Sequence, residues 1–193
     1  MIVQQRQLHH PWVDLMVWRD KLQAKERNMS IKRITLDAVL TAVALSVFII
    51  ELQIPPMVPI PGVKLGLANI ITVYAIFALG RKDAACILFA RILLGGMFSG
   101  QIMSILYSLA GGFLCFATMC IMRKIVTDKQ IWVCSVIGAI AHNIGQITVA
   151  IIIANTFALI VYLPVLLISG MIAGFCTGLC AQMVVNHMKN IHS

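Results

Sequence analysis

Residues 54–69 read IPPMVPIPGVKLGLAN and separate two long apolar stretches of the chain. Four of the six prolines lie here, at Pro55, Pro56, Pro59 and Pro61. Proline lacks a backbone donor and disfavours helix in the residue before it, so no helix runs through this stretch. We predict a stiff, water-facing loop that carries Lys64 and Asn69 to the mouth of a helical bundle, as one wall of a binding site. The alternative is a plain proline-rich connector.

The composition is that of an integral membrane protein. The 193 residues are 60% hydrophobic and 11% charged, with a mean hydropathy of +0.94. A soluble domain carries roughly 25% charged residues. The apolar runs have helical lengths and no alternating ten-residue pattern, which favours an all-α bundle over a β-barrel. No apolar core of a cleavable signal peptide is seen in the first thirty residues.

The apolar runs predict a bundle of six transmembrane helices. These spans cover about 35–54, 65–80, 84–98, 101–122, 131–153 and 158–185. Pro164 is expected to kink the sixth span or to mark where it begins. The domain organisation is therefore a basic tail at 1–34, a transmembrane domain at 35–185 and a short cytoplasmic tail at 186–193.

Residues 1–34 are polar and basic, and three interpretations of them stay open. Trp12, Leu15, Met16 and Leu22 could form the apolar side of a short interfacial helix. The segment could instead be a disordered tail. Translation could also begin at Met29, because the sequence MSIKR directly before a span is an ordinary start for a membrane protein.

Lysine and arginine are distributed unevenly along the predicted topology. With the N-terminus in the cytoplasm, the inner segments hold 13 of the 15, the outer segments hold Lys64 alone, and Arg91 lies inside a span. This split follows the positive-inside rule and predicts a protein of the cell membrane with both termini cytoplasmic. It also explains the net charge of +8 without a nucleic-acid partner.

Arg91 lies in the middle of the third predicted span. Insertion of an arginine there costs roughly 2.5–3.5 kcal/mol, so it should face the interior of the bundle and have a partner. Glu51, near the outer end of the first span, could form a structural ion pair with it. Alternatively, Arg91 or Lys64 binds an anionic group of a ligand.

The fifth span carries three polar side chains within five residues, His142, Asn143 and Gln146. His142 and Gln146 are four residues apart and share a face of the helix. They could make interhelical hydrogen bonds that only lock the bundle. We favour a role in a cavity, because Asn143 lies on a different face. Together with Lys64, Asn69 and Arg91, these residues predict a site for an amphipathic ligand with an anionic or carbonyl end.

Small residues recur at intervals of four on three spans. Ala38 and Ala42 form an AxxxA pattern in the first span, which could serve a partner protein. The other two ridges are expected to pack inside the bundle. They consist of Ser104, Ser108 and Gly112, and of Gly170, Gly174 and Gly178.

No motif of a soluble enzyme is present. The seven acidic residues are scattered, and the sequence has no Walker A, HExxH or GxSxG pattern. The six cysteines all lie in apolar runs and are interpreted as small hydrophobes rather than as metal ligands or a disulfide framework. We therefore expect no catalytic residues, no metal and no cofactor, and no ATP hydrolysis by this chain alone.

Several motifs in order resemble the Gx transporter family, which is also labelled heptaprenyl diphosphate synthase component I. They are PGVKLGLAN at 61–69, GRKDA at 80–84, RILLG at 91–95, SLAGG at 108–112 and GAIAHNIGQ at 138–146. The resemblance covers roughly residues 35–185. The family is similar to the substrate-binding S-components of energy-coupling factor (ECF) vitamin transporters.

The resemblance implies a six-helix bundle that binds a small substrate near its outer side. It also implies docking, through an alanine motif matched by Ala38 and Ala42, to a T-component that carries two ATPases. The alternative function is a membrane accessory subunit of polyprenyl diphosphate or quinone synthesis. Prenyl transfer itself needs Mg²⁺ held by aspartate clusters, which this sequence lacks. A third possibility is a stand-alone facilitator or scaffold.

Overall fold

The computed structural model describes residues 11–54, 64, 66–100 and 102–192, and its regular structure in these residues is entirely helical. The prolines of the predicted loop and the first ten residues of the predicted tail lie outside the described residues. The chain divides into two units, residues 1–36 and residues 37–193. The second unit contains the C-terminal part of the first helix and all the helices that follow it.

The described residues form six α-helices and two short 3-10 helices, in the order that the sequence predicts. They are α1 (Pro11–Leu52), α2 (Asn69–Ala78), α3 (Arg81–Ser99), α4 (Ile102–Met122), η1 (Asp128–Gln130), α5 (Ile131–Ala154), η2 (Phe157–Tyr162) and α6 (Leu163–His192). Pro164 lies in the first turn of α6, where proline is tolerated, so it marks the beginning of this helix rather than a kink.

The helix that contains the first predicted span begins at Pro11, not near residue 35. Proline suits the first position of a helix, because the donor that it lacks would be unpaired there. Neither glycine nor proline occurs from residue 12 to residue 53, so nothing in this stretch breaks the helix. Residues 11–34 are therefore helical and continue into the first predicted span.

Among the described residues, four segments are long and apolar enough to cross a membrane, which is fewer than the six predicted spans. They are Ser30–Leu52, Ile102–Met122, Ile131–Ala154 and Phe157–Asn190. Helix α2 has only 10 residues, about 15 Å, against a hydrocarbon core of about 30 Å. Helix α3 has 19 residues, but it carries three charged residues in its first turn and Arg91 further on.

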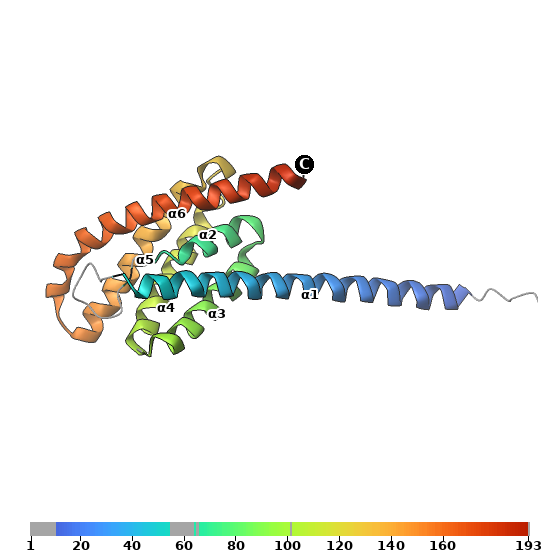
Figure 1. The fold of residues 1–193 in the computed structure, drawn as a ribbon, viewed down its shortest axis with the longest axis horizontal. Coiled ribbons are helices and arrows are strands. Elements are labelled where there is room, and N and C mark those ends of the chain that lie inside the picture. The colour runs from blue at the N-terminus through green and yellow to red at the C-terminus, as the bar shows by residue number, and fades with distance from the viewer. Residues whose placement is uncertain (1–10, 55–63, 65, 101, 193) are drawn as a thin grey trace, which may run out of the picture. The chain divides into compact units, whose positions relative to one another are not determined.

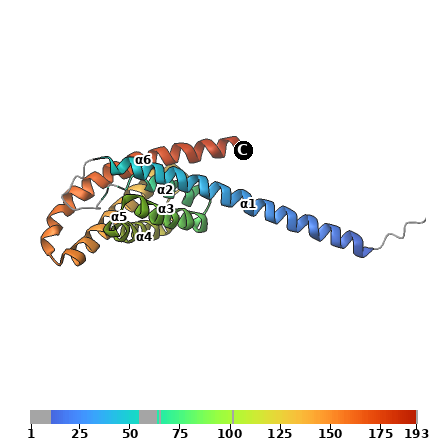
Figure 2. The same ribbon diagram turned by 60° about the horizontal axis from the view of Figure 1, so that its bottom comes forward.

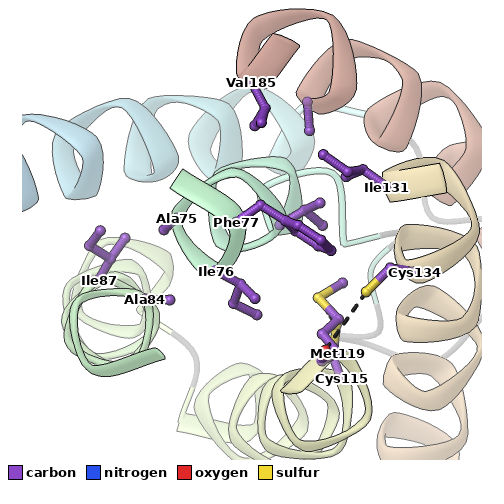
Figure 3. Close-up of a cluster of buried hydrophobic side chains, with 12 residues drawn as sticks. Ala75, Ile76, Phe77, Ala84, Ile87, Cys115, Met119, Ile131, Cys134 and Val185 are labelled. Carbon is purple, nitrogen blue, oxygen red and sulfur yellow. Dashed lines mark hydrogen bonds between the residues drawn. The ribbon is translucent and has the colours of Figure 1, made fainter. Parts of the chain in front are cut away.

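Helix α2 is short but central. It contacts α3, α4, α5 and α6, while α5 packs along both α4 and α6 (Figures 1 and 2). Val73, Ala75 and Ile76 of α2 are completely buried. Figure 3 shows α2 side chains meeting Ile87 of α3 and residues of the longer helices. A helix too short to span is therefore held by packing inside the bundle.

The glycine ridge of α6 packs directly on the backbone of α5, which confirms the internal role predicted for it. A Cβ on Gly178 would lie 2.6 Å from the Cα of Trp132, and one on Gly174 would lie 3.1 Å from the carbonyl oxygen of Ser135. The first distance is shorter than real Cβ contacts, and the second is tighter than most of them. The glycines thus allow the close approach of α5 and α6.

The outward-facing side chains of the long helices are apolar. Exposed large hydrophobic residues include Val39 and Ile50 on α1, Met97 and Phe98 on α3, Phe113 on α4, Ile152 on α5 and Ile172 on α6. A soluble monomer rarely exposes so many large apolar side chains. These helices indicate a membrane-embedded protein.

Candidate functional site

A tight turn at Gly66 leads into the start of α2. Gly66 adopts a φ of +80°, in the left-handed region that favours glycine. Its carbonyl accepts a hydrogen bond from the Asn69 N–H at 2.9 Å. Its own N–H donates to the Glu51 Oε1 at 2.6 Å. The carboxylate of Glu51, which is buried, therefore fixes the backbone that leads into α2.

Lys64 reaches from the same turn to α4 and α1. Its Nζ donates to the Ser104 Oγ at 2.8 Å and lies 3.9 Å from the centre of the Phe48 ring, a cation–π distance. Burial lowers the pKa of the Lys64 ammonium to about 8, although the nearby Glu51 carboxylate opposes this shift. The side chain is still mostly protonated at pH 7.

Arg91 of α3 is 5% exposed and points into the same region. Its guanidinium donates to the Asn69 Oδ1 at 3.2 Å. Its Nε–H has no hydrogen-bond partner among the described residues. The predicted direct ion pair with Glu51 is not formed, because each group bonds to a different neutral partner. The two charges still attract each other at longer range.

His142 of α5 is wedged between the turn and α4. A Cβ on Gly66 would lie 3.1 Å from the His142 Cδ2, and one on Gly111 would lie 2.8 Å from its Nδ1. Glycine at both places therefore makes room for the ring. His142 is only 3% exposed, and among the described residues its Nδ1 lies beside the Gly111 backbone without a hydrogen bond of good geometry.

These contacts bring four of the six predicted site residues together. We call the set made of Glu51, Lys64, Asn69, Arg91 and His142 the polar cluster. It draws on α1, Lys64 of the segment before α2, α2, α3 and α5 within the unit of residues 37–193. Residues that are separated by up to 91 positions in sequence thus form one buried, charged group inside an otherwise apolar bundle.

Gln146 lies one turn after His142 on α5, whereas the Asn143 amide nitrogen is bonded to α6. Gln146 lies four residues after His142 on the same face, is 1% exposed, and its Oε1 has no partner among the described residues. The Asn143 amide nitrogen instead donates to the backbone carbonyl of Leu166 in α6. A Cβ on Gly170 would collide with that same nitrogen.

The Asn143 amide nitrogen is thus used at the contact with α6, while its Oδ1, like the Gln146 Oε1, has no hydrogen-bond partner among the described residues. A step of one residue rotates a helix by about 100°, so Asn143 faces α6 when His142 faces the polar cluster. Its amide makes an interhelical hydrogen bond, the alternative to a cavity role that the sequence left open. The structure thus separates a locking role for Asn143 from the surroundings of His142.

Three residues that complete these contacts were not predicted as part of the site. They are Phe48, Gly66 and Ser104. Ser104 had been assigned only to a packing ridge, and it does lie there, 1% exposed. Phe48 is three residues before Glu51 and so shares its helix face, which was the one signal that could have identified it.

Ala38 and Ala42 lie on the opposite side of α1 from these contacts. Both are exposed, whereas Thr41, Ala44 and Phe48 are buried. The AxxxA pattern is therefore not used for packing against the described residues of the bundle. All six cysteines are free thiols, in agreement with their interpretation as small hydrophobes.

Comparison with known proteins gives one match. The family model described as heptaprenyl diphosphate synthase component I matches residues 40–184, which is more than half of the 193 residues. The matched segment contains the whole polar cluster and leaves α1 before residue 40 outside. No curated protein and no solved structure matches the chain.

Proposed function

This chain belongs to the heptaprenyl diphosphate synthase component I family, and from that premise we propose that it is a membrane subunit that binds a small molecule for transport. The observation that carries the proposal is the polar cluster with its incomplete hydrogen bonding. Arg91, His142 and Gln146 each bury a polar atom that has no partner among the described residues. A bound substrate would supply those partners.

The energetic argument is the cost of such atoms. Leaving a buried donor or acceptor unpaired costs about 1–3 kcal/mol, and more for a charged group. A purely structural cluster would pair these groups with one another or replace them by apolar side chains, which is often as stable. Lys64 and Arg91 are each bonded to a neutral partner instead. A ligand that supplies the missing hydrogen bonds and negative charge explains this arrangement better.

The chain is proposed to act as a subunit and not as a catalyst. Prenyl transfer from a diphosphate requires acidic side chains that hold Mg²⁺. The seven acids of the sequence are scattered, and Glu51 is already engaged by the Gly66 N–H. The family description names a component, so the alternative function is an accessory membrane subunit beside a soluble prenyl diphosphate synthase.

We further propose that the polar cluster faces the outer side of the cell membrane and that both termini are cytoplasmic, following the split of lysine and arginine. Cysteine introduced at Asn155, in the turn after α5, is expected to react with a membrane-impermeant maleimide added to intact cells. Cysteine at Lys129 should react only after lysis. The parent chain controls for native thiols, and the reversed pattern would refute this orientation.

The transport step is proposed to be energised by partners, a T-component with two ATPases, as in ECF transporters. Ala38 and Ala42 form an exposed small-residue face on α1 that would admit a partner helix. Ala38→Leu and Ala42→Leu are expected to reduce recovery of the partner complex by about tenfold, with ligand binding unchanged. Ala154→Leu, at an exposed alanine at the end of α5, is the matched control.

Affinity purification of the tagged chain from its native membrane tests the proposal as a whole. Recovery of a T-component and ATPases supports it. Recovery of a soluble prenyl synthase favours the accessory subunit, and recovery of neither favours a stand-alone facilitator. A complex that survives both alanine substitutions unchanged would rule out α1 as the docking surface.

A further inference from the structure

The polar cluster carries an unequal number of charges. Counted in their ionised forms, Lys64 and Arg91 contribute two positive charges and Glu51 contributes one negative charge. Burial of Glu51 opposes its ionised carboxylate, whereas the Gly66 N–H and the two nearby cations favour it. Each of the three is hydrogen-bonded to a neutral group: the Ser104 hydroxyl, the Asn69 amide and the Gly66 backbone. No other ionised side chain is placed in these contacts by the described residues, so the cluster has a net charge of +1.

We propose that this site selects a small organic monoanion with a hydrogen-bond-donating group, and that Glu51 is the residue that excludes ligands of higher negative charge. The inference rests on the proposed function, since it names the substrate class of the same site. It assigns Glu51 a role in specificity, in addition to its structural hydrogen bond with the turn.

The unpaired atoms define what the ligand must offer. The Arg91 Nε–H is a charged donor and is suited to an oxyanion such as a carboxylate. The Gln146 Oε1 is an acceptor, so it requires a donor, for example a hydroxyl or amine group of the ligand. The His142 Nδ1 can take either role, depending on the tautomer. An anion without a donor would leave the glutamine oxygen unsatisfied.

The charge of the site argues against a prenyl diphosphate, the ligand that the family description suggests first. A monoanion would bring the polar cluster to neutrality. A diphosphate with two or three negative charges would leave it negative, next to the buried Glu51 carboxylate. Charges interact strongly where water is scarce, so this excess is costly. Diphosphate sites normally balance this negative charge with metal ions or several cations, and the described residues of the polar cluster include two cations.

Thermal unfolding of the purified full-length chain in detergent, at constant ionic strength, tests this charge class with defined probes. The probes are 3-hydroxybutyrate, its neutral methyl ester and inorganic pyrophosphate. We expect 3-hydroxybutyrate to raise the unfolding temperature saturably, and neither of the other two to do so. In Glu51→Gln, which keeps a hydrogen-bond acceptor for Gly66, the apparent Kd for pyrophosphate should fall at least about tenfold.

Two further variants assign the effect to the site. Arg91→Lys should weaken the response to 3-hydroxybutyrate at least about tenfold, while Lys124→Gln, at an exposed lysine after α4, should leave it unchanged. If Glu51→Gln does not fold, the inference is tested by the order in which the three probes raise the unfolding temperature of the unmodified chain. Equal stabilisation by the ester, stronger stabilisation by pyrophosphate, or no response to any probe would overturn the inference. A failed partner purification would instead count against the transporter role and leave this ranking standing.

Discussion

Arg91→Ala is expected to abolish measurable substrate binding, with a loss of about 2–5 kcal/mol, the range for removing one partner of a buried hydrogen-bonded charge pair. The substitution removes the one fully charged, unpaired donor of the polar cluster and leaves the Asn69 Oδ1 without its donor. It also turns the net charge of the cluster from +1 to zero. The free energy of unfolding should fall less than the affinity, because Lys64 still balances Glu51.

The measurement needs the natural ligand, which native mass spectrometry of small molecules that co-purify with the chain can identify. That compound is then titrated into the wild type, Arg91→Ala and Arg91→Lys. Lysine keeps the charge but not the planar fork of donors, so Arg91→Lys should restore only part of the affinity. Lys124→Ala, at an exposed position outside the cluster, serves as the control. Unchanged binding in Arg91→Ala would show that Arg91 does not bind the substrate.

The helices could be predicted from local sequence signals. The predicted spans at 84–98, 101–122 and 131–153 each differ from α3, α4 and α5 by no more than three residues at either end. The breaks are marked by residues that stop helices, such as Gly80, with a φ of +124°, and Gly100, with a φ of +63°. Apolar length and helix-breaking residues are properties of a short window, so they can be read without the fold.

The ends of the first two helices show where local signals fail. A helix was only one of three interpretations left open for the basic, polar residues 11–34, although lysine, glutamate, glutamine and arginine are good helix formers. The second span was predicted to begin at 65, whereas α2 begins at Asn69 because Gly66 turns the chain first. Neither outcome depends on hydrophobicity, which was the main property used to define the spans.

The candidate site was predicted in outline but not in its pairings. Burial of Arg91 and His142 follows from the cost of polar groups in an apolar environment, and both are buried. Which residue bonds to which depends on helix rotation and on contacts between distant segments. The sequence suggested that Glu51 would pair with Arg91, but the turn at Gly66 brings a backbone donor closer to the carboxylate.

Gln146→Ala is expected to lower substrate affinity, whereas Asn143→Ala is expected to lower stability, although the two residues are only three positions apart. Gln146 shares the face of His142 and offers an unpaired acceptor. Its removal should lower substrate affinity by about 1–3 kcal/mol and leave the free energy of unfolding almost unchanged. A side chain that served only packing would show the reverse.

Asn143→Ala should lower the free energy of unfolding by about 1–3 kcal/mol, with little change in affinity. It removes the amide that donates to the Leu166 carbonyl and leaves a void beside Gly170 on α6. That carbonyl also accepts from the Ser169 hydroxyl at 3.1 Å, so the loss stays moderate. Ile144→Ala, at the exposed position between the two, controls for general effects on α5. If Gln146→Ala reduces only thermal stability, while binding is unchanged, the polar face of α5 is a structural lock and the substrate lies elsewhere.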